Sequence, residues 1–194
     1  MMMRLRDLVF AMVCMVAVGR AKESSSVQSS NIIEMSAHKN FAYTGPAFLG
    51  TPIQSNSTTF LFDTASNKTV MNRDHYDSAL SSTYQNASEN TTQLTIGNLT
   101  LNGSMVKDTV CLADAAWACA SSFEFFVSTS QMKFDGYLGL APKSSFVSAL
   151  YKQGKIREPI VSFNYNRDDL QRSLVMIGEN SFSDTDNTNY KYDT

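Results

Sequence analysis

The chain has 194 residues, a formal net charge of −2 at pH 7 and 43% hydrophobic residues, which suits one domain with its own core or one lobe of a larger protein. Its lysines and arginines are scattered and form no basic stripe, which argues against a nucleic-acid-binding protein. The abundance of Ser, Thr and Asn and a charged fraction of 18% favour a secreted β-rich protein over a cytosolic helical one.

The first 21 residues have the pattern of a secretion signal. Arg4 and Arg6 precede the apolar run 8–18, and Gly19-Arg20-Ala21 places small residues at the two positions that a signal peptidase reads. The apolar run is too short to span a bilayer, which needs about 20 residues. We therefore expect removal of residues 1–21, no membrane span, and a secreted or lumenal protein, possible destinations including a lysosome-like or vacuole-like compartment. An uncleaved anchor is the alternative.

The remainder of the chain predicts an all-β fold. Residues 22–40 are polar and are predicted to be a flexible N-terminal segment, and 66–92 are polar and loop-rich. Short runs of β-branched, aromatic and other apolar residues predict strands. In chain order these strands are predicted at 41–50, with a break at Gly45-Pro46, and at 57–63, 123–128, 134–141, 159–165 and 173–178. We find no repeat and no alternation of strands with helices.

One hairpin and one helix complete the expected elements. Residues 93–112 predict a hairpin with two competing turns, Gly97-Asn98 and Asn102-Gly103, and the second is the better type I′ dipeptide. Residues 145–152 predict the helix, with Ser144 or Ser145 as the N-cap and Gly154 as the stop.

The cysteines suggest one disulfide. Cys14 lies in the signal, so Cys111 and Cys119 remain, and two cysteines in a secreted chain most simply pair with each other. Such a bond would stabilise the fold by about 2–3 kcal/mol. The alternative is a reactive cysteine with a histidine partner, for which the sequence offers only His38 and His75, both in polar stretches.

Asn-x-Ser/Thr sites agree with export. Each is a candidate for N-glycosylation on a surface loop, although some matches are expected by chance in a chain rich in these residues. The six sites are Asn56, Asn67, Asn86, Asn90, Asn98 and Asn102.

Asp63 is the residue whose position most needs an explanation. It follows the apolar run Phe60-Leu61-Phe62 and begins the turn "DTAS". A carboxylate led into an interior is costly unless hydrogen bonds hold it. An ordinary turn with an Asx-type hydrogen bond is one explanation.

The order of several motifs provides another. The segments "FLGTPIQ", "FLFDTAS", "LSSTY", "KDTV", "FDGYLGLAP", "KQGKI" and "GENSF" follow one another, and in this order residues 41–182 resemble the N-terminal lobe of a pepsin-like aspartic endopeptidase. The corresponding family motifs include D-T-G-S and F-D-G-I-L-G-L. The resemblance implies a single β-barrel-like lobe, a peptide or protein substrate, and neither a cofactor nor a metal. Residues 183–194 would then be a polar tail or the start of a second lobe.

The resemblance also implies roles for individual residues. Asp63 stands at the catalytic position, and Thr64 stands where a hydroxyl braces the turn of the opposite lobe. Ser66 stands where a hydroxyl hydrogen-bonds the aspartate, and Tyr137-Leu138-Gly139 stands where residues pack behind the active-site loop. In this family two aspartates share a proton and hold one water, so that one acts as base while the other donates to the scissile carbonyl.

Three departures from the family pattern bear on activity. Ala65 replaces the glycine of D-T-G-S, and its Cβ could displace Asp63. Counting back from "KDTV" places Gly97 on the glycine and Ile96 on the tyrosine of the family's flap, the hairpin that covers substrate. The tryptophan that usually follows D-T-G-S is also missing, since Trp117 is the only tryptophan. Finally, the chain has no second D-T-G or D-S-G, and Asp135 in "FDGY" is a poor second aspartate.

These observations leave three hypotheses. The chain supplies half of an aspartic endopeptidase, completed by a second lobe or by a homodimer that provides Asp63 twice. Alternatively, it is a secreted, non-catalytic relative that binds peptides, or a fragment whose exposed face prevents stable folding. A lone aspartate, with an ordinary pKa of about 4, can accept a proton once ionised but cannot also donate one.

Overall fold

The structure is a computed structural model that describes residues 31–38, 42–54, 59–87, 92–165 and 173–179. The proposed signal 1–21 and the tail 183–194 lie outside these residues. None of the helices within the described ranges is long and apolar enough to cross a membrane.

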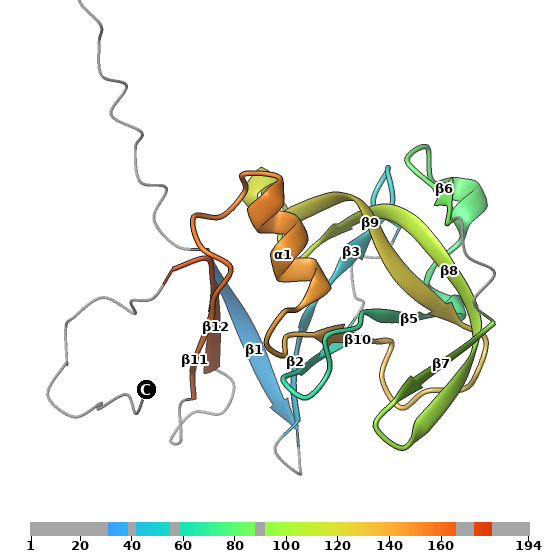
Figure 1. The fold of residues 1–194 in the computed structure, drawn as a ribbon, viewed down its shortest axis with the longest axis horizontal. Helices are drawn as coiled ribbons and strands as arrows, with labels where there is room; N and C mark the ends of the chain where they lie inside the picture. Colours follow the sequence, from blue (N-terminus) through green and yellow to red (C-terminus); the bar gives the residue numbers. More distant parts are fainter. Residues whose placement is uncertain (1–30, 39–41, 55–58, 88–91, 166–172, 180–194) are drawn as a thin grey trace, which may run out of the picture.

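The described residues form a mainly β structure with one α-helix, as predicted (Figure 1). The strands are β1 (Ile32–His38), β2 (Ala42–Pro46), β3 (Phe48–Leu49), β4 (Thr59–Asp63), β5 (Val70–Asn72), β6 (Gln85–Asn86), β7 (Gln93–Ile96), β8 (Leu99–Cys111), β9 (Cys119–Ser128), β10 (Gly136–Gly139), β11 (Val161–Asn164) and β12 (Ser173–Ile177). The helices are α1 (Ser145–Lys152) and the short 3-10 helices η1 (Arg73–His75), η2 (Ser78–Leu80) and η3 (Ala116–Ala118).

Within the described ranges the strands join in one open, strongly curved sheet. Its order is β11-β12-β1-β2-β4-β10-β5-β9-β8-β3, and β6 and β7 also pair with β8. β11 and β3 are the two ends of this path, so the sheet does not close into a complete barrel. The central strand β10 runs parallel to β4 and antiparallel to β5, so it lies between two strands that come much earlier in the chain.

The prediction that residues 22–40 are flexible is wrong for Ile32–His38, which form β1. This strand pairs with β12, about 140 residues later in the chain, and with β2. Ile33 and Met35 are buried on its inner face. The many polar residues in 22–40 obscure the alternation of apolar and polar residues within β1. Its pairing partner β12 is too distant in sequence for a local pattern to indicate it.

The hairpin uses the turn that the dipeptide rule ranked second. Ile96 pairs with Leu99, so Gly97-Asn98 is the two-residue loop. Gly97 has a φ of +55°, which suits the glycine-led type II′ turn. Gly103 instead lies inside β8, where an added Cβ would meet the Val127 carbonyl oxygen at 2.0 Å. The close approach of β9 therefore explains this glycine, and the competing turn prediction is wrong.

The predicted helix has the predicted bounds. The Ser144 hydroxyl accepts a hydrogen bond from Val147 N at 3.3 Å and donates one to the Gly139 carbonyl at 2.5 Å. Gly154 follows the helix with a φ of +66°, as expected of a C-terminal stop. One face of α1 buries Phe146, which packs edge-on against Phe123 of β9 at 5.4 Å between ring centroids. The cap on Ser144 thus ties the helix to the strand that ends beside Asp63.

Two groups of buried side chains hold the sheet together. The large core includes the fully buried Phe60, Phe125, Phe146, Leu138 and Leu150, each of which contributes on the order of 2 kcal/mol by burial. A smaller cluster consists of Val70, Leu101 and Phe126, with Leu94, Ile96, Met105, Met132 and Tyr137 packed against it. The smaller cluster therefore joins the hairpin to β10.

The predicted disulfide is present and excludes a free thiol at either cysteine. Cys111 and Cys119 are bonded, with their Cα atoms 4.0 Å apart. They face each other where β8 ends and β9 begins. The bond closes the loop that contains Trp117, whose ring packs against the large core.

Candidate active site

Asp63 is the last residue of β4 and lies opposite Gly139 in the parallel pairing with β10. Its main-chain carbonyl accepts a hydrogen bond from Leu140 N at 2.7 Å, which fixes the backbone at the end of the strand. Its carboxylate accepts one from Ala65 N, with Oδ1 2.8 Å away. The side chain is only partly buried. Asp63 is therefore held by β4 and the following turn, with its carboxylate open on one side.

Ala65 contributes its backbone N–H to holding the Asp63 carboxylate. Its N–H makes the hydrogen bond to Asp63, and its backbone is not among the described non-glycine residues with positive φ, which are Ser122 and Lys143. Glycine is therefore not required here for backbone conformation. Ala65 is exposed, so its Cβ points to a surface that this lobe leaves open.

Thr64 and Ser66 take different positions in the turn. Thr64 is exposed, whereas Ser66 is buried. The Ser66 hydroxyl oxygen accepts a hydrogen bond from Lys68 N at 3.0 Å. Within the described residues it makes no hydrogen bond to Asp63, which differs from the role that the resemblance implied. The local serine turn, in which a side chain bonds the backbone two residues on, occupies this hydroxyl.

Tyr137, Leu138 and Gly139 belong to β10, which runs parallel to β4 and next to it. Leu138 is fully buried. A Cβ added to Gly139 would meet the backbone N and O of Lys68 at 2.5 Å, so the loop packs directly on the glycine. Tyr137 is only half-buried. It also lines the cavity beside Asp63.

The hairpin tip closes one side of that cavity. A space of about 290 Å³ is lined by Asp63 and Ala65 from the turn, Ile96, Gly97 and Leu99 from the hairpin, and Tyr137 from β10. Ile96 and Gly97 thus line the same cavity as Asp63, and their assignment to a flap stays a prediction. No sequence pattern identifies Leu99 as a lining residue, because its position depends on which dipeptide forms the turn.

Tyr137 has an altered acidity. Burial and the nearby Asp63 charge both raise the pKa of the Tyr137 phenol above its ordinary value. The phenol therefore stays protonated through neutral pH and is a hydrogen-bond donor inside the cavity.

A second aspartate is buried but lies away from the cavity. Asp108 is fully buried and accepts hydrogen bonds from the Tyr76 hydroxyl at 2.7 Å and from Thr109 N at 2.7 Å. The Thr83 hydroxyl donates to its other face. Burial and this aspartate raise the pKa of Tyr76 far above its ordinary value. The motifs "LSSTY" and "KDTV" thus meet in a polar network that joins loops, a role that the sequence alone did not reveal.

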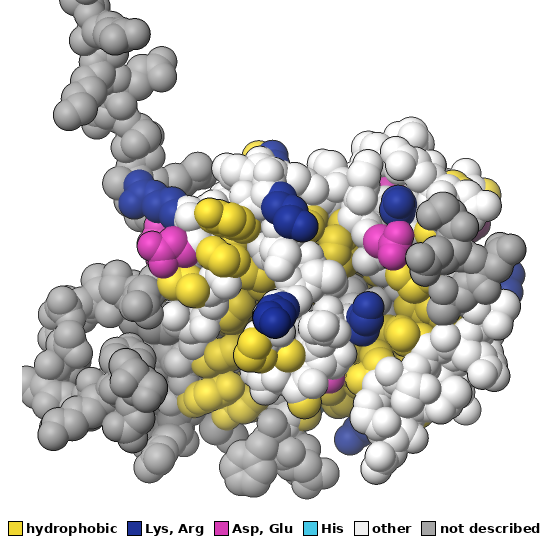
Figure 2. All heavy atoms as spheres, viewed as in Figure 1, with side chains coloured by type: hydrophobic (Ala, Val, Ile, Leu, Met, Phe, Trp, Pro, Cys, Tyr) yellow, Lys and Arg dark blue, Asp and Glu magenta, His cyan; other side chains and the backbone are white. Residues whose placement is uncertain are grey.

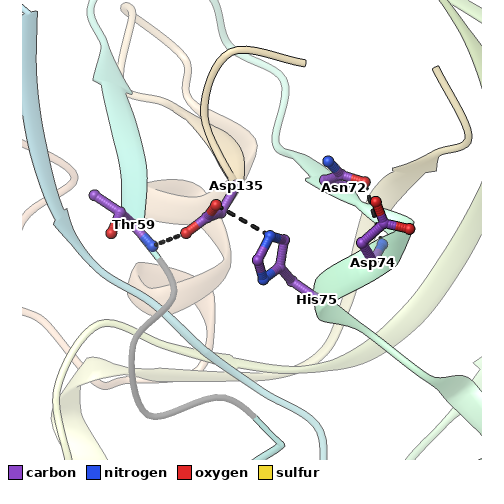
Figure 3. A network of polar contacts seen from close by, with 5 residues as sticks. All are labelled: Thr59, Asn72, Asp74, His75 and Asp135. Atoms are coloured by element: carbon purple, nitrogen blue, oxygen red, sulfur yellow. Dashed lines mark hydrogen bonds and ion pairs between the residues drawn. The ribbon is translucent and has the colours of Figure 1, made fainter. Parts of the chain in front are cut away.

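Asp135 cannot act as the partner of Asp63. In Figure 3 its carboxylate lies between Thr59 and His75, accepting from Thr59 N at 2.8 Å and pairing with His75 Nε2 at 3.1 Å. Thr59 begins β4 and Asp63 ends it, so the two aspartates are at opposite ends of the strand. Asn72 and Asp74, also in Figure 3, form an adjacent cap in which Asp74 N donates to Asn72 Oδ1 at 3.1 Å. Asp135 therefore fixes the backbone at the start of β4 through its hydrogen bond from Thr59 N.

The glycosylation candidates divide by position. Those within the described residues, namely Asn67, Asn86, Asn98 and Asn102, are all exposed. Asn56 and Asn90 lie outside the described residues. Asn98 is in the two-residue loop at the hairpin tip, and Asn67 follows the Asp63 turn. No group of three or more metal-ligating side chains occurs within the part of the chain that the structure describes.

Comparison with known proteins agrees with this geometry. The family model described as "Eukaryotic aspartyl protease" matches residues 42–193, which is most of the chain. No curated protein matches the chain.

Proposed function

Because the chain belongs to the eukaryotic aspartyl protease family, we propose that it supplies one of the two catalytic aspartates of an aspartic endopeptidase, and that this aspartate is Asp63. The observation that carries the proposal is the cavity that Asp63 lines together with the hairpin tip at Ile96. A peptide entering this space would have a carboxylate on one side and an apolar cover on the other.

The chemistry needs a second carboxylate close to the first. Peptide hydrolysis requires one group to take a proton from water while another donates a hydrogen bond or proton to the scissile carbonyl. Two adjacent carboxyl groups do this by sharing one proton, since their mutual repulsion splits their pKa values. Asp108 and Asp135 are occupied elsewhere in the fold, and Asp63 is the one carboxylate among the described residues that line the cavity. The partner aspartate would therefore come from a second lobe or from Asp63 of a second copy of the chain.

Exposed residues on the Asp63 turn and near the edge strand β11 suit contact with a facing lobe or a second copy of the chain. Thr64 and Ala65 are exposed on the turn itself. Tyr165, at the end of the edge strand β11, is 49% exposed and stacks with Phe163 at 5.7 Å. Figure 2 shows further hydrophobic side chains gathered beside α1 and over β1 and β12. Exposed apolar surface of this kind favours association with another protein surface.

The substrate would be an extended peptide with apolar residues near the cleaved bond. Ile96 and Leu99 of the hairpin and Ala65 of the turn line the cavity with apolar side chains. The expected site of action is the secretory pathway or a compartment reached through it, which the signal pattern at 1–21 and the exposed Asn-x-Ser/Thr sites support.

The test is digestion of an unfolded protein at about pH 3 to 5, where one carboxyl of such a pair is ionised. Full-length chain, secreted from a eukaryotic host, is compared with Asp63→Asn and with Asp114→Asn, a control in an exposed loop. The proposal predicts cleavage that is blocked by a transition-state-analogue inhibitor of aspartic proteases, lost in Asp63→Asn and kept in Asp114→Asn. Cleavage that survives Asp63→Asn would discard the assignment.

A non-catalytic peptide-binding role is the second candidate. Ile96 at the hairpin tip has no polar group to align a substrate, and it packs against the small cluster of Val70, Leu101 and Phe126. A protein of this kind would bind extended peptides through the same cavity without cleaving them. Equal peptide affinity in wild type and Asp63→Asn, with no hydrolysis by any associated form, would favour this role.

A further inference from the structure

The geometry points to Tyr137 as the side chain that hydrogen-bonds a peptide held over Asp63. This inference rests on the proposed function, because it assigns a substrate contact in the same cavity. It goes beyond the packing role that the motif around Tyr137 implied.

The lining of the cavity leaves Tyr137 as its side-chain donor. The described residues that line it are Asp63, Ala65, Ile96, Gly97, Leu99 and Tyr137. Four of these have no polar side-chain atom, and an ionised aspartate only accepts hydrogen bonds. A peptide carbonyl or hydroxyl oxygen in this space therefore meets one side-chain donor, the Tyr137 phenol.

The phenol is available for this contact while its ring is held in place. The backbone of Tyr137 pairs with both Leu61 of β4 and Val70 of β5. The ring packs edge-on against Phe134, with centroids 6.1 Å apart, and against the small cluster that includes Leu101. Within the described residues the hydroxyl makes no hydrogen bond. Because the ring is already held in place, its hydroxyl can bind a ligand with little loss of conformational entropy.

The protonation state of the phenol suits the role. Burial first, and then the Asp63 charge, raise its pKa above the ordinary value. The hydroxyl is thus kept as a donor over the acidic and neutral range in which Asp63 would act. A peptide oxygen bound in the cavity that Tyr137 and Asp63 line could therefore accept a hydrogen bond from this hydroxyl.

The sequence pattern supports a relocation of this hydroxyl. The family motif that resembles "FDGYLGL" has isoleucine at position 137, and the family's flap has tyrosine at position 96. In this chain the two residue types are exchanged, with Ile96 on the hairpin and Tyr137 on the floor.

The test measures binding without requiring cleavage. The probe is a peptide in which a hydroxyethylene unit replaces the amide between two phenylalanines, labelled for fluorescence anisotropy at about pH 5. Tyr137→Phe removes only the hydroxyl, and Tyr151→Phe, at a 48% exposed position on α1, is the matched control. We expect Tyr137→Phe to weaken binding about 3- to 10-fold, as for one neutral hydrogen bond, with an unchanged melting temperature. Adding Ile96→Tyr to that variant should restore part of the affinity.

A second readout does not depend on any ligand. Tyrosine labelled with ¹³C at Cζ reports ionisation of Tyr137 by NMR as pH is raised, and Asp63→Asn should move this ionisation to lower pH. Unchanged peptide affinity in Tyr137→Phe, or no measurable probe binding by wild type, would overturn the inference. An unmoved titration in Asp63→Asn would overturn the placement of the phenol beside Asp63. Weakened binding in Tyr137→Phe without hydrolysis would retain the inference and reject the proposed protease. Hydrolysis by the wild type, together with unchanged probe binding in Tyr137→Phe, would retain the proposed protease and reject the inference about Tyr137.

Discussion

The packing of the Asp63 loop on Gly139 makes a sharp prediction for Gly139→Ala. The added Cβ would meet the Lys68 backbone N and O at 2.5 Å and the Asn67 carbonyl carbon at 2.6 Å. All three atoms belong to main chain, so no side-chain rotation relieves the contact. Ordinary contact with a Cβ begins at 3.4 Å, and the loop must retreat by 0.9 Å (3.4 minus 2.5).

We expect this displacement to affect both stability and the site. Overpacking a rigid interior costs about 1–3 kcal/mol, and a contact with backbone on both sides should lie near the upper value. Gly139 is also the register partner of Asp63, and Leu140 N donates to the Asp63 carbonyl at 2.7 Å. A shift of this size would displace Asp63 within the cavity that it lines, so we expect weaker peptide binding.

Urea unfolding and peptide binding measure the two effects. Gly154→Ala is the control, because its Cβ would meet nothing within 4 Å and only its φ of +66° is unfavourable. That control should lose about 1–2 kcal/mol and keep its peptide affinity. A loss below about 0.5 kcal/mol in Gly139→Ala, with unchanged binding, would refute the packing argument.

Four further predictions concern other parts of the chain. Asp108→Ala should lower the free energy of unfolding by about 3–5 kcal/mol, because buried donors lose their acceptor; a urea titration with a loss below about 1 kcal/mol would contradict this. The folded-state pKa of Tyr76 is raised above its unfolded value of about 10, so the stability it contributes should be complete below pH 10 and be lost above it. Melting curves of Tyr76→Phe should then show a shallower alkaline decline, and an identical decline would count against the Asp108 contact. Replacing Cys111 and Cys119 by alanine should cost about 2–3 kcal/mol from the loss of a short closed loop, and an unaltered urea midpoint would argue against this. Asn98→Gln should remove one glycan from the secreted protein, because Asn98 is exposed at the hairpin tip; an unchanged intact mass would show that the site is not used.

The parts of the fold predicted correctly from sequence are those that depend on local signals. The bounds of α1 follow from the Ser144 cap and the Gly154 stop, both of which act within one turn of the helix. The end of β4 at Asp63 follows from the apolar run before it and the turn after it. Neither prediction needs knowledge of which strand lies alongside.

The predictions that failed depend on contacts between distant segments. The dipeptide Asn102-Gly103 predicts a turn, because the sequence does not show that β9 packs against Gly103. Residues Ile32–His38 were predicted to be flexible, because the sequence does not show their pairing with β12. The hydrogen bonds of Asp108 join segments 25 and 32 residues apart, and no spacing rule indicates such a network. Tyr137 was assigned to packing because the motif shows its neighbours in sequence and not the cavity that its ring reaches.

The central claim is that Asp63 works only when another carboxylate lies beside it. The most direct measurement is the rate of peptide hydrolysis as a function of chain concentration, with the association state followed by sedimentation on the same samples. We predict no hydrolysis by a monomer of this 194-residue chain, and activity that rises with self-association or with addition of a partner lobe carrying its own aspartate. Hydrolysis by a sedimentation-verified monomer, abolished by Asp63→Asn, would contradict the account.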